Sequence, residues 1–112
     1  MEIKLTECVK TAKELIIPAE INDKKVSTIG LNFTSYNSSI EKVSIPEGVT
    51  TLDSFAFDSC ENLESINIPS TVTFIGHGTF RNCSSLKEIE IPDNITRLYF
   101  STFEGCSSLE SV

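Results

Sequence analysis

The feature that most constrains this chain is an internal repeat. Three segments of 23 residues align with one another without a gap: 40–62, 63–85 and 86–108. A unit this short cannot bury its own apolar side chains, so it must stack on copies of itself. The repeat therefore predicts a solenoid before any local propensity is considered.

Each unit begins with alternating aliphatic residues and a proline. In the middle unit these are Leu63, Ile66, Ile68 and Pro69. Residues two apart lie on the same face of a strand, and proline has no amide proton with which to continue a ladder. The pattern predicts a short strand with one apolar face, which the proline ends.

The second half of each unit carries two aliphatic residues, a phenylalanine and a cysteine. In the middle unit these are Val72, Ile75, Phe80 and Cys83. We expect the aliphatic residues to close the far wall of the coil and the phenylalanine to fill its wide part. The same places hold Val49, Leu52, Phe57 and Cys60 in the unit before, and Ile95, Leu98, Phe103 and Cys106 in the unit after.

The period extends towards the N-terminus with an insertion. Residues 15–18 match 66–69, whereas five extra residues fall within 21–26. Insertions of this kind belong in a loop on one face of a repeat array. At the cysteine place this early unit has Asn37, and we expect Phe33 to substitute for the missing phenylalanine.

The sequence predicts one repeat domain with a short cap. Ile3 and Leu5 alternate with polar residues outside the repeat, so residues 1–11 are expected to form an N-terminal capping strand. Residues 12–112 form the repeat domain, with coils at 12–39 (which carries the insertion), 40–62, 63–85 and 86–108 and a partial coil at 109–112.

These motifs resemble the BspA-like leucine-rich repeat family. Its features are a proline after the strand, an Ile-Gly pair and a Phe-x-x-Cys motif in each coil, as in residues 63–76 and 79–86. The sequence departs from the pattern at Asn37, and at Asp53 and Tyr99, where glycine is usual. The resemblance implies a leucine-rich repeat solenoid, conventionally grouped with α/β folds but mostly β here. It implies a right-handed coil with a parallel strand ladder on one face and short extended or irregular segments on the other.

The resemblance also implies a function in protein recognition. Family members are mostly surface or secreted proteins concerned with adhesion, so a host, matrix or cell-surface protein is the expected ligand. An intracellular repeat scaffold is the alternative. The N-terminus lacks the apolar region of a signal peptide. The protein would therefore be cytoplasmic if Met1 is the native start, and at the cell surface or secreted if the resemblance holds.

The outward side chains of the strand face form the candidate binding surface. They are polar and mixed in sign and include no aromatic anchor, which favours weak or multivalent contacts. The candidate partner-binding residues are Glu14, Ile16, Lys42, Ser44, Ser65, Asn67, Glu88 and Glu90. On the opposite face, Phe74 and Tyr99 fall on neighbouring coils and form a rival patch if Phe100 does not turn inwards beside Phe103.

The cysteines could form disulfides, bind zinc or remain thiols. Cys60, Cys83 and Cys106 recur at the repeat period, so their side chains point in parallel directions, whereas a disulfide needs Cβ vectors that face each other. Zinc sites usually place ligands two to four residues apart. We therefore expect a structural column of buried thiols, which Asn37 continues, and an exposed thiol at Cys8.

Composition and charge argue against several classes of function. With 9 Lys and Arg against 16 Asp and Glu, the net charge of -7 disfavours nucleic acid as a partner. No apolar run approaches the about 20 residues that span a bilayer, so no membrane insertion is expected. His77 lies beside glycines in a turn, and no nucleophile has a partner base. We expect no enzyme activity, no cofactor and no metal site.

The final coil raises the question of self-association. Nothing in the sequence covers its apolar residues from the C-terminal side: Leu86, Ile89, Ile91, Leu98 and Phe103. Repeat arrays need a polar cap at each end, and open strand edges pair readily with other chains. We expect either a longer array or association of two copies through the C-terminal coil.

Overall fold

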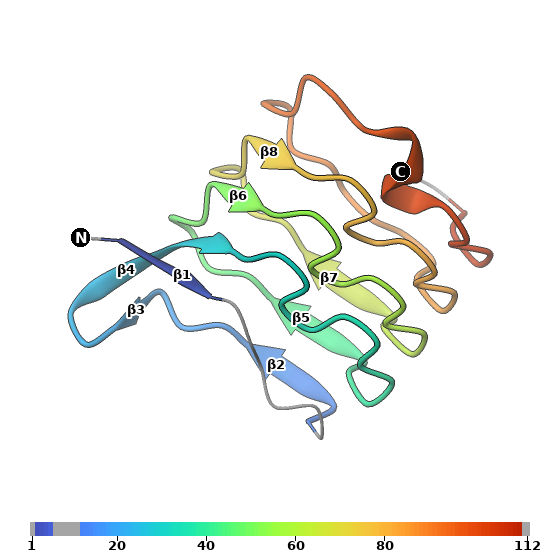
Figure 1. Cartoon of the computed structure of the whole chain (residues 1–112), viewed down its shortest axis with the longest axis horizontal. Coiled ribbons are helices and arrows are strands. Elements are labelled where there is room, and N and C mark those ends of the chain that lie inside the picture. Colours follow the sequence, from blue (N-terminus) through green and yellow to red (C-terminus); the bar gives the residue numbers. More distant parts are fainter. Residues whose placement is uncertain (1, 6–11, 111–112) are drawn as a thin grey trace.

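The computed structural model describes residues 2–5 and 12–110 of the chain. Figure 1 shows successive coils lying side by side, from the blue N-terminal end to the red C-terminal end. Short strands line the two long sides of this stack. The structure is therefore a solenoid with short strands on two opposite sides.

One side, the strand face, carries the candidate binding residues. It is a parallel sheet of β2 (Glu14–Ile16), β5 (Lys42–Ser44) and β7 (Ser65–Asn67). Lys42 lies opposite Ser65, which is 23 positions further along the chain. Glu14 lies opposite Lys42, 28 positions further along, because the first coil carries the extra residues. The expected parallel ladder is confirmed.

The opposite face carries a second parallel ladder. It is built from β4 (Lys24–Ile29), β6 (Thr51–Leu52) and β8 (Phe74–Ile75), as expected for short extended segments. β1 (Glu2–Leu5) pairs in parallel with β4 and extends this sheet beyond the first coil. It lies within the segment where a capping strand was expected, whereas residues 6–11 lie outside the described part of the chain.

The insertion in the first coil is a β-hairpin and not the loop that the sequence suggested. β3 (Glu20–Ile21) runs antiparallel to the start of β4, with Ile21 opposite Lys24. Asn22 and Asp23 connect the two strands with φ angles of 53° and 63°. Two-residue hairpin turns of type I′ require positive φ at both positions, and asparagine and aspartate tolerate it better than other side chains.

The core is a narrow apolar strip that runs through all coils. Its aliphatic members are almost completely buried: Ile17, Val26, Ile29, Ile40, Val43, Ile45, Val49, Leu52, Leu63, Ile66, Val72, Ile75, Leu86 and Ile89. Burying a side chain of this kind stabilises the fold by about 1.5–3 kcal/mol relative to leaving it in water. The alternation along each strand thus fixes which face points inwards.

A column of phenylalanine rings fills the wide part of the coils. The rings of Phe57 and Phe80 stack with centroids 5.7 Å apart and planes 3° apart, and Phe80 stacks on Phe103 in the same way. In the first coil Phe33 meets Phe57 edge-on at 6.2 Å and is 3% exposed. The expected substitution by Phe33 is confirmed.

The last coil is less regular than the ones before it. Its strand segment is reduced to an isolated bridge at Glu88, and the 3₁₀ helix η1 (Phe100–Phe103) follows its far wall. Leu98 was expected to close that wall but is 43% exposed, because residues 96–98 form no ladder strand beside β8.

The expectation that nothing covers this coil is wrong for two of its residues. Leu86 is completely buried and Ile89 is 4% exposed, and Leu109 packs against the core they belong to. Ile91 and Phe103 are half-buried. The apolar surface that remains at this end is therefore smaller than the sequence suggested.

Candidate partner-binding surface

All eight candidate partner-binding residues are exposed to solvent. Strand pairing places Glu14, Lys42 and Ser65 in one column, and Ile16, Ser44 and Asn67 in a second. Glu88 and Glu90 follow on the next coil as the outward neighbours of buried Ile89. Period-two alternation exposes them all, because the residue between each pair points into the core.

Asn67 has a structural contact that the sequence did not reveal. Its side-chain oxygen accepts a hydrogen bond from the backbone N–H of Ile45 at 2.9 Å, and its amide nitrogen donates to the carbonyl of Ile45 at 3.0 Å. The side chain therefore clasps the end of β5 as a further strand residue would. A partner that used this amide would have to compete with both bonds.

Glu90 occupies the place of Asn67 in the next coil, one repeat further on. A carboxylate accepts hydrogen bonds but has no proton to donate, so it cannot reproduce both halves of the clasp on Ile68. Glu90→Asn is therefore expected to stabilise the last coil by about 1 kcal/mol. Asn67→Asp should have the opposite effect.

Denaturant melts of the two variants beside the original chain measure this difference. If Glu90→Asn leaves the midpoint unchanged while Asn67→Asp lowers it, the clasp does not transfer to the last coil. The loose strand segment at Glu88 would then need another cause.

A hollow of about 410 Å³ opens on the strand face between the third and fourth coils. It lies where regular pairing stops, and Ser65, Glu88 and Glu90 contribute to its wall. The face that was expected to lack an aromatic anchor therefore has a concave part. The sequence signal that could have indicated this hollow is the change from Asn67 to Glu90 at the same place in successive coils.

The rival patch on the opposite face is an aromatic cluster. Phe74 is 41% exposed and its ring meets that of Tyr99 edge-on at 6.2 Å. His77 lies 3.8 Å from the Tyr99 ring, and the guanidinium of Arg97 lies 5.7 Å from it. The other three side chains thus surround Tyr99, whereas Phe74, His77 and Arg97 remain exposed. The Phe100 side chain lies outside the described residues.

The cysteine column forms a regular set of hydrogen bonds. Each thiol donates to a backbone carbonyl in the coil before it: Cys60 to Thr34, Cys83 to Phe57 and Cys106 to Phe80, at 3.0 to 3.3 Å. Asn37 continues the column, with its amide donating to the Thr34 hydroxyl and its carbonyl accepting from the backbone N–H of Ser39. The structural column is thus present, and its three cysteines are not disulfide-bonded.

Burial of the column differs between its members. Cys60 and Cys83 are completely buried, whereas Cys106 is only half-buried, which corrects the expectation of full burial for all three. Burial raises the pKa of the Cys83 thiol far above its ordinary value, and its neighbours Cys60 and Cys106 add to the effect. Burial also raises the pKa of Cys106. Cys8 lies outside the described residues.

The raised pKa of Cys83 predicts a loss of stability in alkali. An unfolded thiol ionises near pH 8.5, so the unfolded chain releases a proton above that pH while folded Cys83 retains its own. The stabilisation is complete below about pH 8.5 and falls by up to about 1.4 kcal/mol per pH unit above it. Urea melts from pH 7.5 to 10 should show a steeper loss for the original chain than for Cys83→Ala. If the free energy of unfolding fell equally with pH in both chains, the loss of stability could not be assigned to Cys83.

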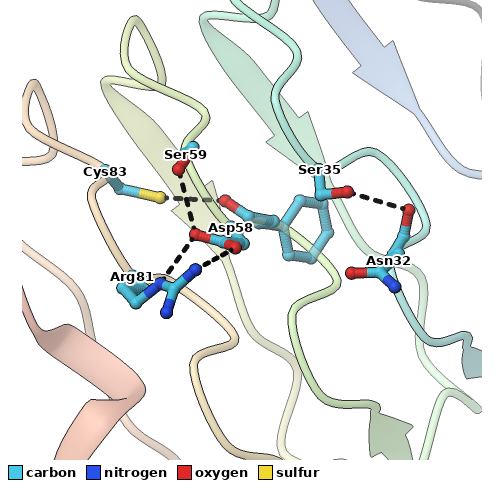
Figure 2. A network of polar contacts seen from close by, with 7 residues as sticks. Asn32, Ser35, Asp58, Ser59, Arg81 and Cys83 are labelled. Atoms are coloured by element: carbon cyan, nitrogen blue, oxygen red, sulfur yellow. Dashed lines mark hydrogen bonds and ion pairs between the residues drawn. The ribbon is translucent and has the colours of Figure 1, made fainter.

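An ion pair between a half-buried guanidinium and a buried carboxylate joins the second and third coils. Figure 2 shows Arg81 reaching Asp58, with Ser59 on the same carboxylate and Cys83 nearby. The guanidinium donates two hydrogen bonds of 2.9 and 3.1 Å to the two carboxylate oxygens, and the Ser59 hydroxyl donates a third at 3.0 Å. The Asp58 side chain is 4% exposed and that of Arg81 33%. The hydrogen bond and charge of Asp58 raise the pKa of Arg81, and the guanidinium also lies over the ring of Phe55.

Two further findings concern the described part of the chain. Within residues 2–5 and 12–110, no group of three or more His, Cys, Asp and Glu side chains is placed to hold a metal ion. In the same residues there is no helix with the length and apolar character that crossing a membrane requires.

Stacked coils with a ladder on each face and a repeated phenylalanine and cysteine column define a leucine-rich repeat solenoid. Residues 10–112 match the family model described as the BspA type leucine rich repeat region (6 copies). The chain belongs to the BspA-type leucine-rich repeat family, as the sequence motifs indicated.

Solved structures with the same fold come from several bacteria. A leucine-rich repeat protein from Eubacterium ventriosum is 33% identical over 91% of this chain, with a TM-score of 0.81. A leucine rich cell surface protein from Faecalibacterium prausnitzii is 24% identical over 96% of this chain, with a TM-score of 0.72. The leucine-rich repeat protein of T. pallidum is 20% identical over 98% of this chain, with a TM-score of 0.56.

This chain is much shorter than the first two of these proteins, since it covers 26% and 37% of their lengths, and it covers 73% of the T. pallidum protein. No curated protein matches it. The family and its structural relatives support a repeat module for protein interaction.

Proposed function

We propose that this chain is a protein-recognition module of a surface or adhesion protein, which binds its ligand through the strand face. The observation that carries the proposal is the set of exposed side chains on the parallel strands β2, β5 and β7, which Glu88 and Glu90 continue on the last coil. A rigid ladder holds these side chains at fixed spacing, which lets a partner contact several coils at once. Repeat solenoids commonly use such extended surfaces for binding.

The expected ligand is a host, matrix or cell-surface protein. The name of the Faecalibacterium prausnitzii relative, a leucine rich cell surface protein, supports a location at the cell surface or outside the cell. The alternative is an intracellular repeat scaffold. Localising the full-length gene product by fractionation and antibody labelling separates the two, because only the first places the module where it can reach an extracellular ligand.

Catalysis and nucleic-acid binding are not part of the proposed function. The net charge of -7 repels phosphate. His77, the single histidine, packs against Tyr99 on the opposite face. We propose no enzyme activity and no cofactor for this module.

Self-association through the C-terminal coil is a second mode of contact that we propose. Ile91 and Phe103 are half-buried, and Leu98 is more exposed still. Light scattering over a range of concentrations should detect a dimer or larger species, and Leu98→Glu should reduce it. A monomer at high concentration, with the last coil protected from hydrogen exchange, would contradict this mode.

A binding screen with matched face variants tests the proposed function. The chain is immobilised and exposed to a panel of purified host, matrix and cell-surface proteins. Ser44→Arg with Ser65→Arg places two bulky cations on the strand face, whereas Thr73→Arg places one on the opposite face. We expect the strand-face variant to weaken binding at least about tenfold through steric and charge conflict, and the control to bind as before. Loss of binding with Thr73→Arg alone would move the interaction to the other face.

A further inference from the structure

The hollow on the strand face adjoins a second one. The first has a volume of about 410 Å³ and the second of about 200 Å³, and Glu90 and Ile91 line both. Together they form a trough along the strand segment of the last coil. Volumes of this size accommodate one or two side chains of a ligand, at the lower end of the range for binding pockets.

The floor of the trough is apolar. Ile66 and Ile89 lie at its inner end, and Leu98 and half-buried Ile91 expose apolar surface in it. An aliphatic side chain placed there would remove this surface from water. Binding is favoured in proportion to the apolar area that is covered in this way.

The rim of the trough is acidic. Glu88 and Glu90 are exposed beside the first hollow, and Asp93 lies beside the second. Among the described residues, no lysine or arginine lines either hollow. Lys87 instead lines a separate hollow with Glu64. The trough therefore combines an apolar floor with uncompensated negative charge.

Local strand pairing explains why the trough opens here. Between β5 and β7, pairing covers three residues and Asn67 extends it to Ile45. In the last coil, pairing is reduced to the bridge at Glu88, and Glu90 cannot form the two-way clasp. The strand segment thus leaves a hollow between the third and fourth coils, in which Ile91 and Leu98 keep exposed surface.

We propose that this trough binds an extended segment of a protein ligand in which an aliphatic side chain is flanked by lysine or arginine. The aliphatic group contacts Ile91 and Leu98, and the flanking cations pair with Glu88 and Glu90. Charge complementarity selects the basic segment, since such complementarity sets the specificity of protein contacts. The inference rests on the proposed function and names the partner chemistry of the same face.

Short synthetic peptides test this chemistry directly. The isotope-labelled chain is titrated with a pentapeptide of alternating lysine and leucine, and its amide NMR signals are followed. Two comparison peptides alternate lysine with glycine and glutamate with leucine. We expect the lysine and leucine peptide to shift the signals of residues 65–66, 88–91 and 98, and to bind more tightly than either comparison peptide.

A charge-matched pair of variants provides the control. Glu88→Gln with Glu90→Gln removes two carboxylates from the rim, and Glu47→Gln with Glu61→Gln removes two exposed carboxylates elsewhere. Each rim substitution should weaken binding of the lysine and leucine peptide about two- to fivefold, the effect of an exposed ion pair. The control pair should change it less than twofold.

Three results would overturn the inference. The first is equal binding of the peptide of lysine and leucine and the peptide of lysine and glycine. The second is an equal effect of the two double variants on binding of the lysine and leucine peptide. The third is a set of trough signals that shift with protein concentration but not with added peptide, which would assign the trough to a second copy of the chain alone. If a protein ligand from the screen is still blocked by Ser44→Arg with Ser65→Arg, the proposed function stands although this inference fails.

Discussion

Phe80→Ala is expected to destabilise the chain by about 3–5 kcal/mol. The Phe80 ring is completely buried and stacks between Phe57 and Phe103, so its removal breaks the aromatic column in the middle of the array. The cost has two parts. The free energy gained by burying the ring is lost, and the neighbouring residues cannot fill the cavity that the ring leaves. Urea melts monitored by circular dichroism measure it.

Lys87→Ala is the matched control on the strand face. Lys87 is exposed on the last coil, beside Glu88, and its substitution should cost less than about 0.5 kcal/mol. Similar midpoints for the two variants would mean that the assignment of inward and outward residues is wrong.

Loss of the ion pair between coils is expected to have the second largest effect. Asp58→Ala removes three hydrogen bonds to a buried carboxylate and should cost about 1–3 kcal/mol. Arg81→Met should destabilise the chain more, because it leaves the Asp58 carboxylate buried without its cation. Denaturant melts of both variants measure the two losses.

The double variant separates pairing from simple truncation. Asp58→Ala combined with Arg81→Met removes both charges, so it should be more stable than Arg81→Met alone. If the two losses simply add, the carboxylate and guanidinium do not depend on each other. The coils would then be held in register by the core alone.

The repeat explains why much of the fold could be predicted from the sequence. Three gapless copies fix which residues share a column, and strand alternation then separates inward Val43 and Ile66 from outward Lys42 and Ser65. The same alignment assigned Phe33 to the aromatic column and Asn37 to the cysteine column.

Features that depend on a single coil could not be read in this way. The hairpin at Asn22 and Asp23 depends on two left-handed backbone conformations in residues that have no counterpart in the other coils. The clasp of Asn67 depends on a side chain that replaces a strand bond, and its position looked like one more outward polar place.

The pairing of Asp58 with Arg81 did leave a signal. The two residues lie one repeat apart, so stacking brings their side chains together, and their opposite charges could have been noticed in the alignment. What the alignment cannot give is burial, because the same column holds Ser35 and Glu104, and only the structure shows that Asp58 is enclosed. The trough beside Glu88 was missed because the change from Asn67 to Glu90 is informative only once the hydrogen bonds of Asn67 are known.

The central claim is that successive repeats stack as neighbouring coils around one aromatic column. Nuclear Overhauser contacts between ring protons test it most directly, with the phenylalanines assigned by single substitutions. The structure predicts contacts between Phe57 and Phe80 and between Phe80 and Phe103, with none between Phe57 and Phe103. A direct contact between Phe57 and Phe103, or no contact between Phe57 and Phe80, would contradict the stacked solenoid.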